Sequence, residues 1–313
     1  MEVLMWISHA ERPLTIDELC LALAVEIGTT NLNPENIRPQ DIVLRSCFGL
    51  VVVDKGPSTV RLIHYTLQEY LGHPNSLPTA HQTLALTCLG YLNYDHIRGL
   101  PADKAPRLQD VPFLEYSSLY WGIHAKEGLS DDVKSLAIEV LSHYDFHISA
   151  TLLFNKIKRY GSRFGVDSLF TNLHFASYFG IVQIVEALTE AKGCDINKAD
   201  CEGYTPFMWA AIHGKEEIVR LLLARNDVNP DTPGKEDVTP LWLASMNGHD
   251  GVVQLLLASD DVDPNKPEIS GQTPLGTASF FGNEGVVRLL LASGRIDPNK
   301  PSHLALSRKF IIK

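Results

Sequence analysis

The motifs that usually identify catalytic side chains are missing from this sequence. It has no His-Glu-x-x-His pattern for a zinc hydrolase, no Gly-x-Ser-x-Gly turn for acyl transfer and no EF-hand loop. It also lacks the two glycine-rich patterns that hold phosphates, the dinucleotide fingerprint and the Gly-x-x-x-x-Gly-Lys-Ser/Thr loop. We therefore expect no enzyme activity, no resident metal and no cofactor, with an enzyme of unrecognised type as an alternative.

A different chemistry, the recognition of another protein, is suggested by side chains that recur every 34 residues in the second half of the chain. A glycine recurs at the same interval. The two residues before each of these glycines form the pairs Tyr178-Phe179, Ile212-His213, Met246-Asn247 and Phe280-Phe281. Exposed apolar strips mark interfaces, and aromatic side chains are favoured as hot spots. We predict that these pairs line a protein-binding groove; the alternative is that some of them fold back onto the neighbouring repeat.

The elements that position these pairs follow from local rules. Threonines precede proline at Thr205, Thr239 and Thr273, which is typical of a helix N-cap with proline in the first turn. The recurring glycine ends this short helix in a left-handed conformation that other residues resist. A second helix with branched apolar residues on a wide face follows, and Asp-Val-Asn-Pro sequences then extend the chain.

Thr-Pro-Leu, Ala-x-x-x-Gly, Val-Val-x-Leu-Leu-Leu and Asp-Val-Asn, in this order, resemble the ankyrin repeat over about residues 167–300. The resemblance implies a four-repeat solenoid that binds protein on its concave surface. The rim of the groove is then formed by residues of the fingers, the loops that join successive repeats: Glu202, Tyr204, Lys235 and Glu236. The period is 34 residues where the common repeat has 33. The finger between Asn229 and Thr239 is lengthened, while the approach to it is shortened. The first repeat has Asn172 in place of proline. Residues 301–313 form a tail without a fifth repeat, so the last repeat is expected to lack a cap and to permit self-association.

Residues 1–75 are predicted to form a winged-helix domain. Three helical patterns, one opened by the capping box Thr15–Glu18, precede two β-rich runs, 50–54 and 59–64, which Lys55-Gly56-Pro57-Ser58 joins as a hairpin. Because winged helices often bind DNA, the alternative function is that of a DNA-associated regulator. The five basic and nine acidic residues of this segment give a net charge of −4, which is wrong for a phosphate-binding surface, so we expect no nucleic acid partner.

The stretch from Ile63 to Leu71 resembles the Met-His-Asp region of the winged-helix domain in NLR-type and apoptosome-type signalling NTPases, and residues 112–122 resemble a helical segment of fungal members that end in ankyrin repeats. In that family the histidine contacts the phosphate of bound ADP. The resemblance implies this role for His64 alone, as a vestigial nucleotide sensor, because the phosphate loop is missing. The competing interpretation is that His64 is a half-buried structural histidine.

Residues 76–166 are predicted to be a helical domain and linker, with helices at 79–91, 112–124, 130–143 and 146–157 and a loop at 93–110. The aromatic residues Phe113, Tyr116, Tyr120 and Trp121 fall at helical spacing, which favours a core over a cofactor site. Lys156, Lys158, Arg159 and Arg163 are read as a solvated basic linker, with contact to an acidic partner as the alternative.

Composition sets the remaining bounds. With 313 residues, 45% hydrophobic and 20% charged, the chain matches an ordinary globular protein of two or three domains. No apolar run reaches the length of a membrane span, and the first residues lack the features of a signal peptide. Five scattered cysteines suit a reducing compartment, with buried thiols acting as small hydrophobes, so we expect a cytoplasmic protein.

Together these features predict a mainly α-helical adaptor. A winged-helix and helical-bundle region is followed by a four-repeat ankyrin solenoid that binds a protein partner of unknown identity. The expected setting is an NLR-like signalling system that lacks its own NTPase domain. No membrane contact is expected.

Overall fold

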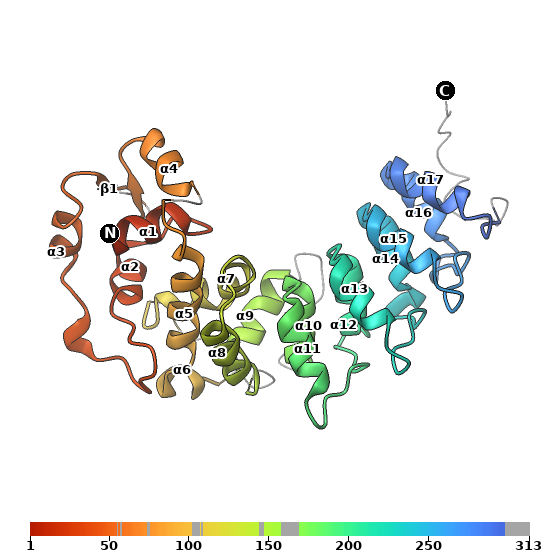
Figure 1. The fold of residues 1–313 in the computed structure, drawn as a ribbon, viewed down its shortest axis with the longest axis horizontal. Coiled ribbons are helices and arrows are strands. Elements are labelled where there is room, and N and C mark those ends of the chain that lie inside the picture. Colours follow the sequence, from red (N-terminus) through yellow and green to blue (C-terminus); the bar gives the residue numbers. More distant parts are fainter. Residues whose placement is uncertain are drawn as a thin grey trace. The chain divides into compact units, whose positions relative to one another are not determined.

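A computed structural model of the chain describes residues 1–54, 56, 58–73, 76–101, 107, 109–143, 147–157 and 169–297. The chain divides into two compact units, Met1–Ser168 and Leu169–Lys313, which we treat one at a time. Both units are built almost entirely from helices (Figure 1). The predicted mainly α-helical class, with a helical region followed by a repeat array, is confirmed.

The first unit opens with three helices and a hairpin, in the order expected of a winged helix (Figure 1). Its elements are α1 (Glu2–His9), α2 (Ile16–Ala22), the 3₁₀ turn η1 (Pro34–Asn36), α3 (Gln40–Arg45), β1 (Val51–Val53), β2 (Val60–Leu62) and α4 (Tyr65–Gly72).

The hairpin strands are antiparallel, with Val51 opposite Leu62 and Val53 opposite Val60. The segment before α2 adds a short third edge, because the Ile16 N–H donates to the Ser58 carbonyl at 3.0 Å. Lys55 and Pro57 of the predicted turn, and Lys158, Arg159 and Arg163 of the predicted basic linker, lie outside the described residues.

The rest of the first unit is a helical bundle made of α5 (Ala80–Leu92), α6 (Asp95–Arg98), α7 (Phe113–Glu127), α8 (Asp131–Leu141) and α9 (Ile148–Ile157). The helix α6 lies inside the segment predicted as a loop, so that prediction is wrong at this point. Tyr94 and Ile97 are fully buried and anchor the turn, and the Tyr94 hydroxyl accepts a hydrogen bond from the Glu26 N–H at 3.0 Å. A tertiary contact therefore stabilises a helix that the local sequence does not favour.

The predicted aromatic core is confirmed. Phe113, Tyr116 and Trp121 are completely buried on α7, while Tyr120 is half-buried. Trp6 of α1 meets the rings of Phe113 and Tyr116 edge-on, at centroid distances of 5.6 and 5.9 Å. Edge-to-face pairs of this kind stabilise a core beyond the burial of their area, and here they join the winged helix to the bundle.

A half-buried ion pair holds the start of α2. Thr15 and Glu18 form the predicted capping box, with the Thr15 N–H donating to Glu18 Oε2 at 2.8 Å. The Arg12 guanidinium donates to both oxygens of the Glu18 carboxylate, at 2.9 and 2.6 Å. It also lies 5.3 Å from the centre of the Tyr116 ring, so Arg12 links the α2 cap to α7.

His124 is buried at the end of a chain of hydrogen bonds. The Glu11 N–H donates to the Tyr116 hydroxyl at 3.1 Å, and that hydroxyl lies 2.8 Å from His124 Nε2. With Nε2 accepting, His124 Nδ1 carries the ring proton and donates to Nδ1 of His81 at 2.9 Å. Burial, with His81 and His9 adding to it, lowers the pKa of His124 to about 3.

The second unit contains four helix pairs within residues 169–297. These are α10 (Asn172–Phe179) with α11 (Val182–Glu190), α12 (Pro206–Ile212) with α13 (Glu216–Leu223), α14 (Pro240–Asn247) with α15 (Asp250–Leu257), and α16 (Pro274–Phe281) with α17 (Glu284–Ala292). The first helices of successive pairs pack against one another, as do the second helices. Figure 1 shows them as a stepwise stack.

The predicted caps are present in the last three pairs. The hydroxyls of Thr205, Thr239 and Thr273 each accept the backbone N–H three residues on. The helix-ending glycines are left-handed, as at Gly248, where φ is 74°. In the first pair His174 occupies the third helical position and its Nδ1 accepts the Thr171 N–H at 3.0 Å, which completes the cap without proline.

We expect acid to destabilise this protein, because buried neutral histidines must take up protons on unfolding. Burial lowers the pKa of His147 and of His174 to about 4. The unfolded chain binds these protons below about pH 6.5, so stability is complete above that pH and falls by up to about 1.4 kcal/mol per unit for each histidine as the pH drops toward 4. Urea unfolding followed by tryptophan fluorescence between pH 7 and 5 measures this slope. A His174→Gln variant should have a smaller slope, and an unchanged free energy of unfolding across this range would contradict the expectation.

Removing Arg12 is expected to destabilise the first unit, because the Glu18 side chain is only 6% exposed and would keep an unpaired charge. Arg12→Ala should lower the free energy of unfolding by about 3 kcal/mol. Arg61→Ala is the matched control, since the side chains of its pair with Asp54 are 60% and 43% exposed, and it should cost less than about 1 kcal/mol. Thermal unfolding of the three proteins tests this, and equal losses for the two variants would contradict it.

Candidate protein-binding surface

The fingers that join successive helix pairs form a continuous backbone ladder. The Lys235 N–H donates to the Glu202 carbonyl at 3.0 Å, and the Ile269 N–H donates to the Glu236 carbonyl at 2.8 Å. These bonds connect each finger to the one before it, so the finger tips are held in a fixed row beside the first helices.

The first finger is organised around a buried carboxylate. Asp200 is 4% exposed and accepts from the Glu202 and Tyr204 N–H groups and from Trp209 Nε1, at 2.9, 2.9 and 2.8 Å. Burial raises the pKa of Asp200, and these three hydrogen bonds oppose that rise. Because Trp209 lies on α12, the carboxylate also orients the finger on the helix that follows it.

Side chains at one recurring position link each repeat to the next. His174 Nε2–H donates to the Tyr204 carbonyl at 2.9 Å, and Trp242 Nε1–H donates to the Gln272 carbonyl at 3.1 Å. The two acceptors are equivalent, since each precedes the N-cap threonine of the next repeat. Met208 occupies this position in the second repeat and packs in an apolar cluster.

The predicted apolar row is present on the first helices. Ile212 and Met246 are half-buried and pack, together with Tyr204 of the finger, against the buried cluster of Met208, Val238 and Leu243. At the two ends of the row, Tyr178 is half-buried and Phe280 is 53% exposed. A partner would therefore meet an apolar row that is most accessible at the last repeat.

The second residue of each pair differs in solvent exposure from one repeat to the next. Phe179 is only 5% exposed and packs against Phe175, with ring centres 4.5 Å apart, so it belongs to the core and does not line an accessible groove. His213 is half-buried, stacked on Trp209 at 5.6 Å. Burial lowers the pKa of His213 to about 4, with Lys215 and His249 adding to the effect. Asn247 and Phe281 are exposed.

The finger rim is acidic. Lys235 Nζ donates to Glu202 Oε2 at 2.9 Å, so the predicted rim residues Lys235 and Glu202 form an ion pair. Glu236 and Asp237 are exposed beside it. Residues 169–297 contain 18 acidic and 9 basic side chains. The resulting field favours basic groups on any partner that approaches this side.

His64 is exposed and precedes α4, and its side chain makes no cap hydrogen bond. The interpretation of His64 as a half-buried structural histidine is therefore wrong.

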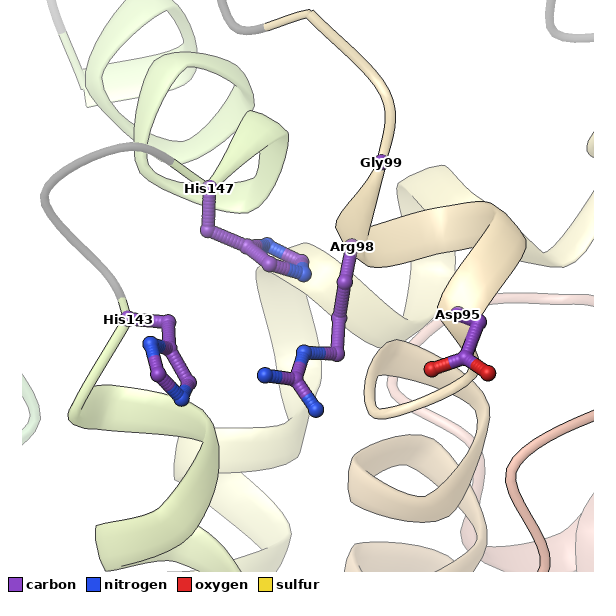
Figure 2. Close-up of a pocket in the computed structure, with 5 residues that line it drawn as sticks. All are labelled: Asp95, Arg98, Gly99, His143 and His147. Atoms are coloured by element: carbon purple, nitrogen blue, oxygen red, sulfur yellow. The ribbon is translucent and has the colours of Figure 1, made fainter.

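The structure adds a pocket that the sequence interpretation missed. It has a volume of about 420 Å³ and is lined by Asp95, Arg98, Gly99, His143 and His147. Figure 2 shows the Arg98 guanidinium reaching between His143 and Asp95. The signal in the sequence that could have indicated this site is the pair of histidines four residues apart, with His143 after the end of α8 and His147 before the start of α9.

The pocket geometry offers little for catalysis. His147 is committed to the backbone, since its Nε2 lies 3.2 Å from the Leu92 carbonyl and its Nδ1 accepts the Ser149 N–H at 3.1 Å. Burial lowers the pKa of His147 to about 4, the Leu92 contact opposes this, and Arg98 and His143 lower it further. Within the described ranges, no three His, Cys, Asp or Glu side chains are grouped to hold a metal.

The described helices include none that is long and apolar enough to cross a bilayer. Cys20, Cys47 and Cys88 are buried, as expected, and Cys194 and Cys201 are half-buried.

Comparison with known families agrees with this geometry. The family model for ankyrin repeats matches in three overlapping copies, at residues 125–233, 173–268 and 226–302, which together span more than half of the chain. The chain belongs to the ankyrin-repeat proteins. The family model described as "GPI inositol-deacylase, winged helix domain" matches residues 1–79. No curated relative matches the sequence.

As an ankyrin-repeat protein, the chain carries a protein-interaction module in its second half. This architecture is typical of modules without enzymatic activity, although it does not exclude such activity. The winged-helix match supports the prediction that the chain begins with a winged-helix domain. The exact domain boundaries stay a prediction.

The second finger stores backbone strain at Asp237. Its φ of 59° is left-handed, whereas the equivalent residues of the neighbouring fingers are Gly203 and Gly271. A left-handed conformation costs a residue with a Cβ about 1–2 kcal/mol. Glycine relieves this cost and increases the entropy of the unfolded chain, so Asp237→Gly should be about 1 kcal/mol more stable than Asp237→Ala. Both variants lose the same carboxylate, which makes alanine the matched control. Urea unfolding compares them, and an alanine variant that is at least as stable would contradict the expectation.

Proposed function

We propose that this ankyrin-repeat protein is an adaptor that binds a protein segment along the row of Tyr178, Ile212, Met246 and Phe280. The observation that carries the proposal is the accessible end of this row, where Phe280 of α16 is 53% exposed. Exposed aromatic side chains on a rigid framework lose little entropy on binding and are frequent hot spots.

The chemistry of the segment follows from the surface around the row. Half-buried apolar side chains line the floor, and the finger rim places Glu236 and Asp237 beside it. A segment with apolar anchors and flanking lysine or arginine residues complements both features. Acidic phosphate backbones do not, so the adaptor is proposed to act without a nucleic acid partner.

The proposed setting is an NLR-like signalling system in the cytoplasm. The support is the pairing of an ankyrin array with a winged helix of a type found in NACHT-containing proteins. His64 is exposed, which would allow it to meet a phosphate. These 313 residues contain no phosphate loop, so the module that holds the nucleotide would lie outside them.

Peptide binding tests the adaptor function. Peptides selected from a random displayed library against the full chain are expected to share apolar anchors flanked by basic residues. Phe280→Ala should weaken their binding by about 1–3 kcal/mol, as measured by fluorescence anisotropy. Thermal unfolding should be nearly unchanged, because the side chain is half exposed.

Phe48→Ala in the winged-helix domain is the control, since Phe48 is 92% exposed and lies far from the array in sequence. Peptides that bind the Phe280→Ala and wild-type chains equally, or that lose affinity only with Phe48→Ala, would place the binding surface elsewhere and sink the proposal.

A further inference from the structure

The last repeat exposes positions that the earlier repeats bury. Val219 and Val253 on α13 and α15 are completely buried, whereas the equivalent Val287 on α17 is half-buried. On the first helices, Ser245 is completely buried and the equivalent Ser279 is exposed. Within the described residues, a following repeat covers these positions in the earlier repeats, and no described repeat covers Val287 and Ser279.

The glycines that end the first helix of each pair also indicate that the last repeat lacks a covering neighbour in the part of the chain that the structure describes. A Cβ on Gly214 would lie 2.7 Å from His249 Nδ1, and a Cβ on Gly248 would lie 2.9 Å from Asn283 Oδ1. In both cases the obstructing side chain comes from the next repeat. Among the described residues, a Cβ on Gly282 meets no atom within 4 Å, so no described side chain takes the place of His249 or Asn283 at the turn after α16.

We call this surface the end face and define it by Leu275, Ser279, Phe281, Val287 and Leu291. Phe281 and Leu291 are 55% and 52% exposed, and Leu275 and Val287 are half-buried. The end face continues the interface that already stacks the repeats, so its shape and apolar character suit another helix pair of the same kind.

We propose that the end face binds the end face of a second copy of this chain, related by a two-fold axis. A contact between identical surfaces must be self-complementary, and the charges beside the end face meet this requirement. Glu284 and Arg288 lie one turn apart on α17, exposed and 3.4 Å from each other. Antiparallel packing of two α17 helices brings each Arg288 opposite the Glu284 of the other copy.

The balance of these two charges matters because residues 169–297 carry a net charge of −9. Two arrays would repel each other through most of their surfaces. The end face has an apolar centre with Glu284 and Arg288 beside it. Two end faces can therefore meet without placing like charges opposite each other. This inference does not depend on the groove described above.

Sedimentation equilibrium of the full chain over a range of concentrations tests the dimer. Leu291→Asp and Arg288→Glu should each weaken association by about tenfold or more, because one buries a charge and the other opposes two acidic side chains. Glu284→Arg combined with Arg288→Glu restores the opposite charges across the axis and should restore association.

Arg220→Glu is the matched control, since Arg220 is exposed at the equivalent position of α13 and should not affect association. Circular dichroism checks that every variant is folded. A chain that stays monomeric at all concentrations would overturn the proposal, as would a dimer insensitive to Leu291→Asp or a double charge reversal that fails to restore association. A monomer whose end face is protected from hydrogen exchange would show that another part of the chain covers it.

Discussion

Each helix pair in residues 169–297 has an apolar face that only a neighbouring pair can bury, and the array depends on this constraint. Val253 and Leu256 of α15 are completely buried. Burying each side chain contributes about 1.5–3 kcal/mol, and the stacking of successive second helices makes this burial possible. This requirement explains the fixed period of 34 residues, because the same contacts must recur at every junction between helix pairs. Where the period stops, apolar surface becomes accessible again at Leu291.

Polar groups at the junctions must be satisfied as well, and the repeats achieve this with different residue types. His174 and Trp242 donate to equivalent carbonyl groups of the following repeat. At the helix turns, His249 Nε2 lies 2.7 Å from the Ile212 carbonyl, and the Asn283 amide donates to the Met246 carbonyl at 2.9 Å. The requirement is that buried carbonyl groups find donors, and the donor's identity is free to vary with the space available.

The first unit is held by long-range contacts of another kind. Arg12 joins the α2 cap to the Tyr116 ring, and Tyr116 joins the backbone at Glu11 to His124. Such a network requires every member to be paired, since an unpaired charge or ring nitrogen in the interior is costly. The first unit therefore depends on buried polar contacts between residues that are far apart in the sequence, such as Glu11 and Tyr116.

The sequence by itself determined the elements whose signals are local. The threonine caps, the left-handed glycines, the capping box at Thr15 and the helix–hairpin order of the winged helix all depend on residues close together in the chain. The tertiary structure alone decided the accessibility of each side chain. Phe179 and Phe281 occupy equivalent positions, yet one is 5% exposed and the other 55%. Likewise, the burial of Tyr94 and Ile97 anchors α6, and the fold brings Arg98 of α6 to the same pocket as His143 and His147. Burial is set by neighbours that are distant in the sequence, so no local pattern encodes it.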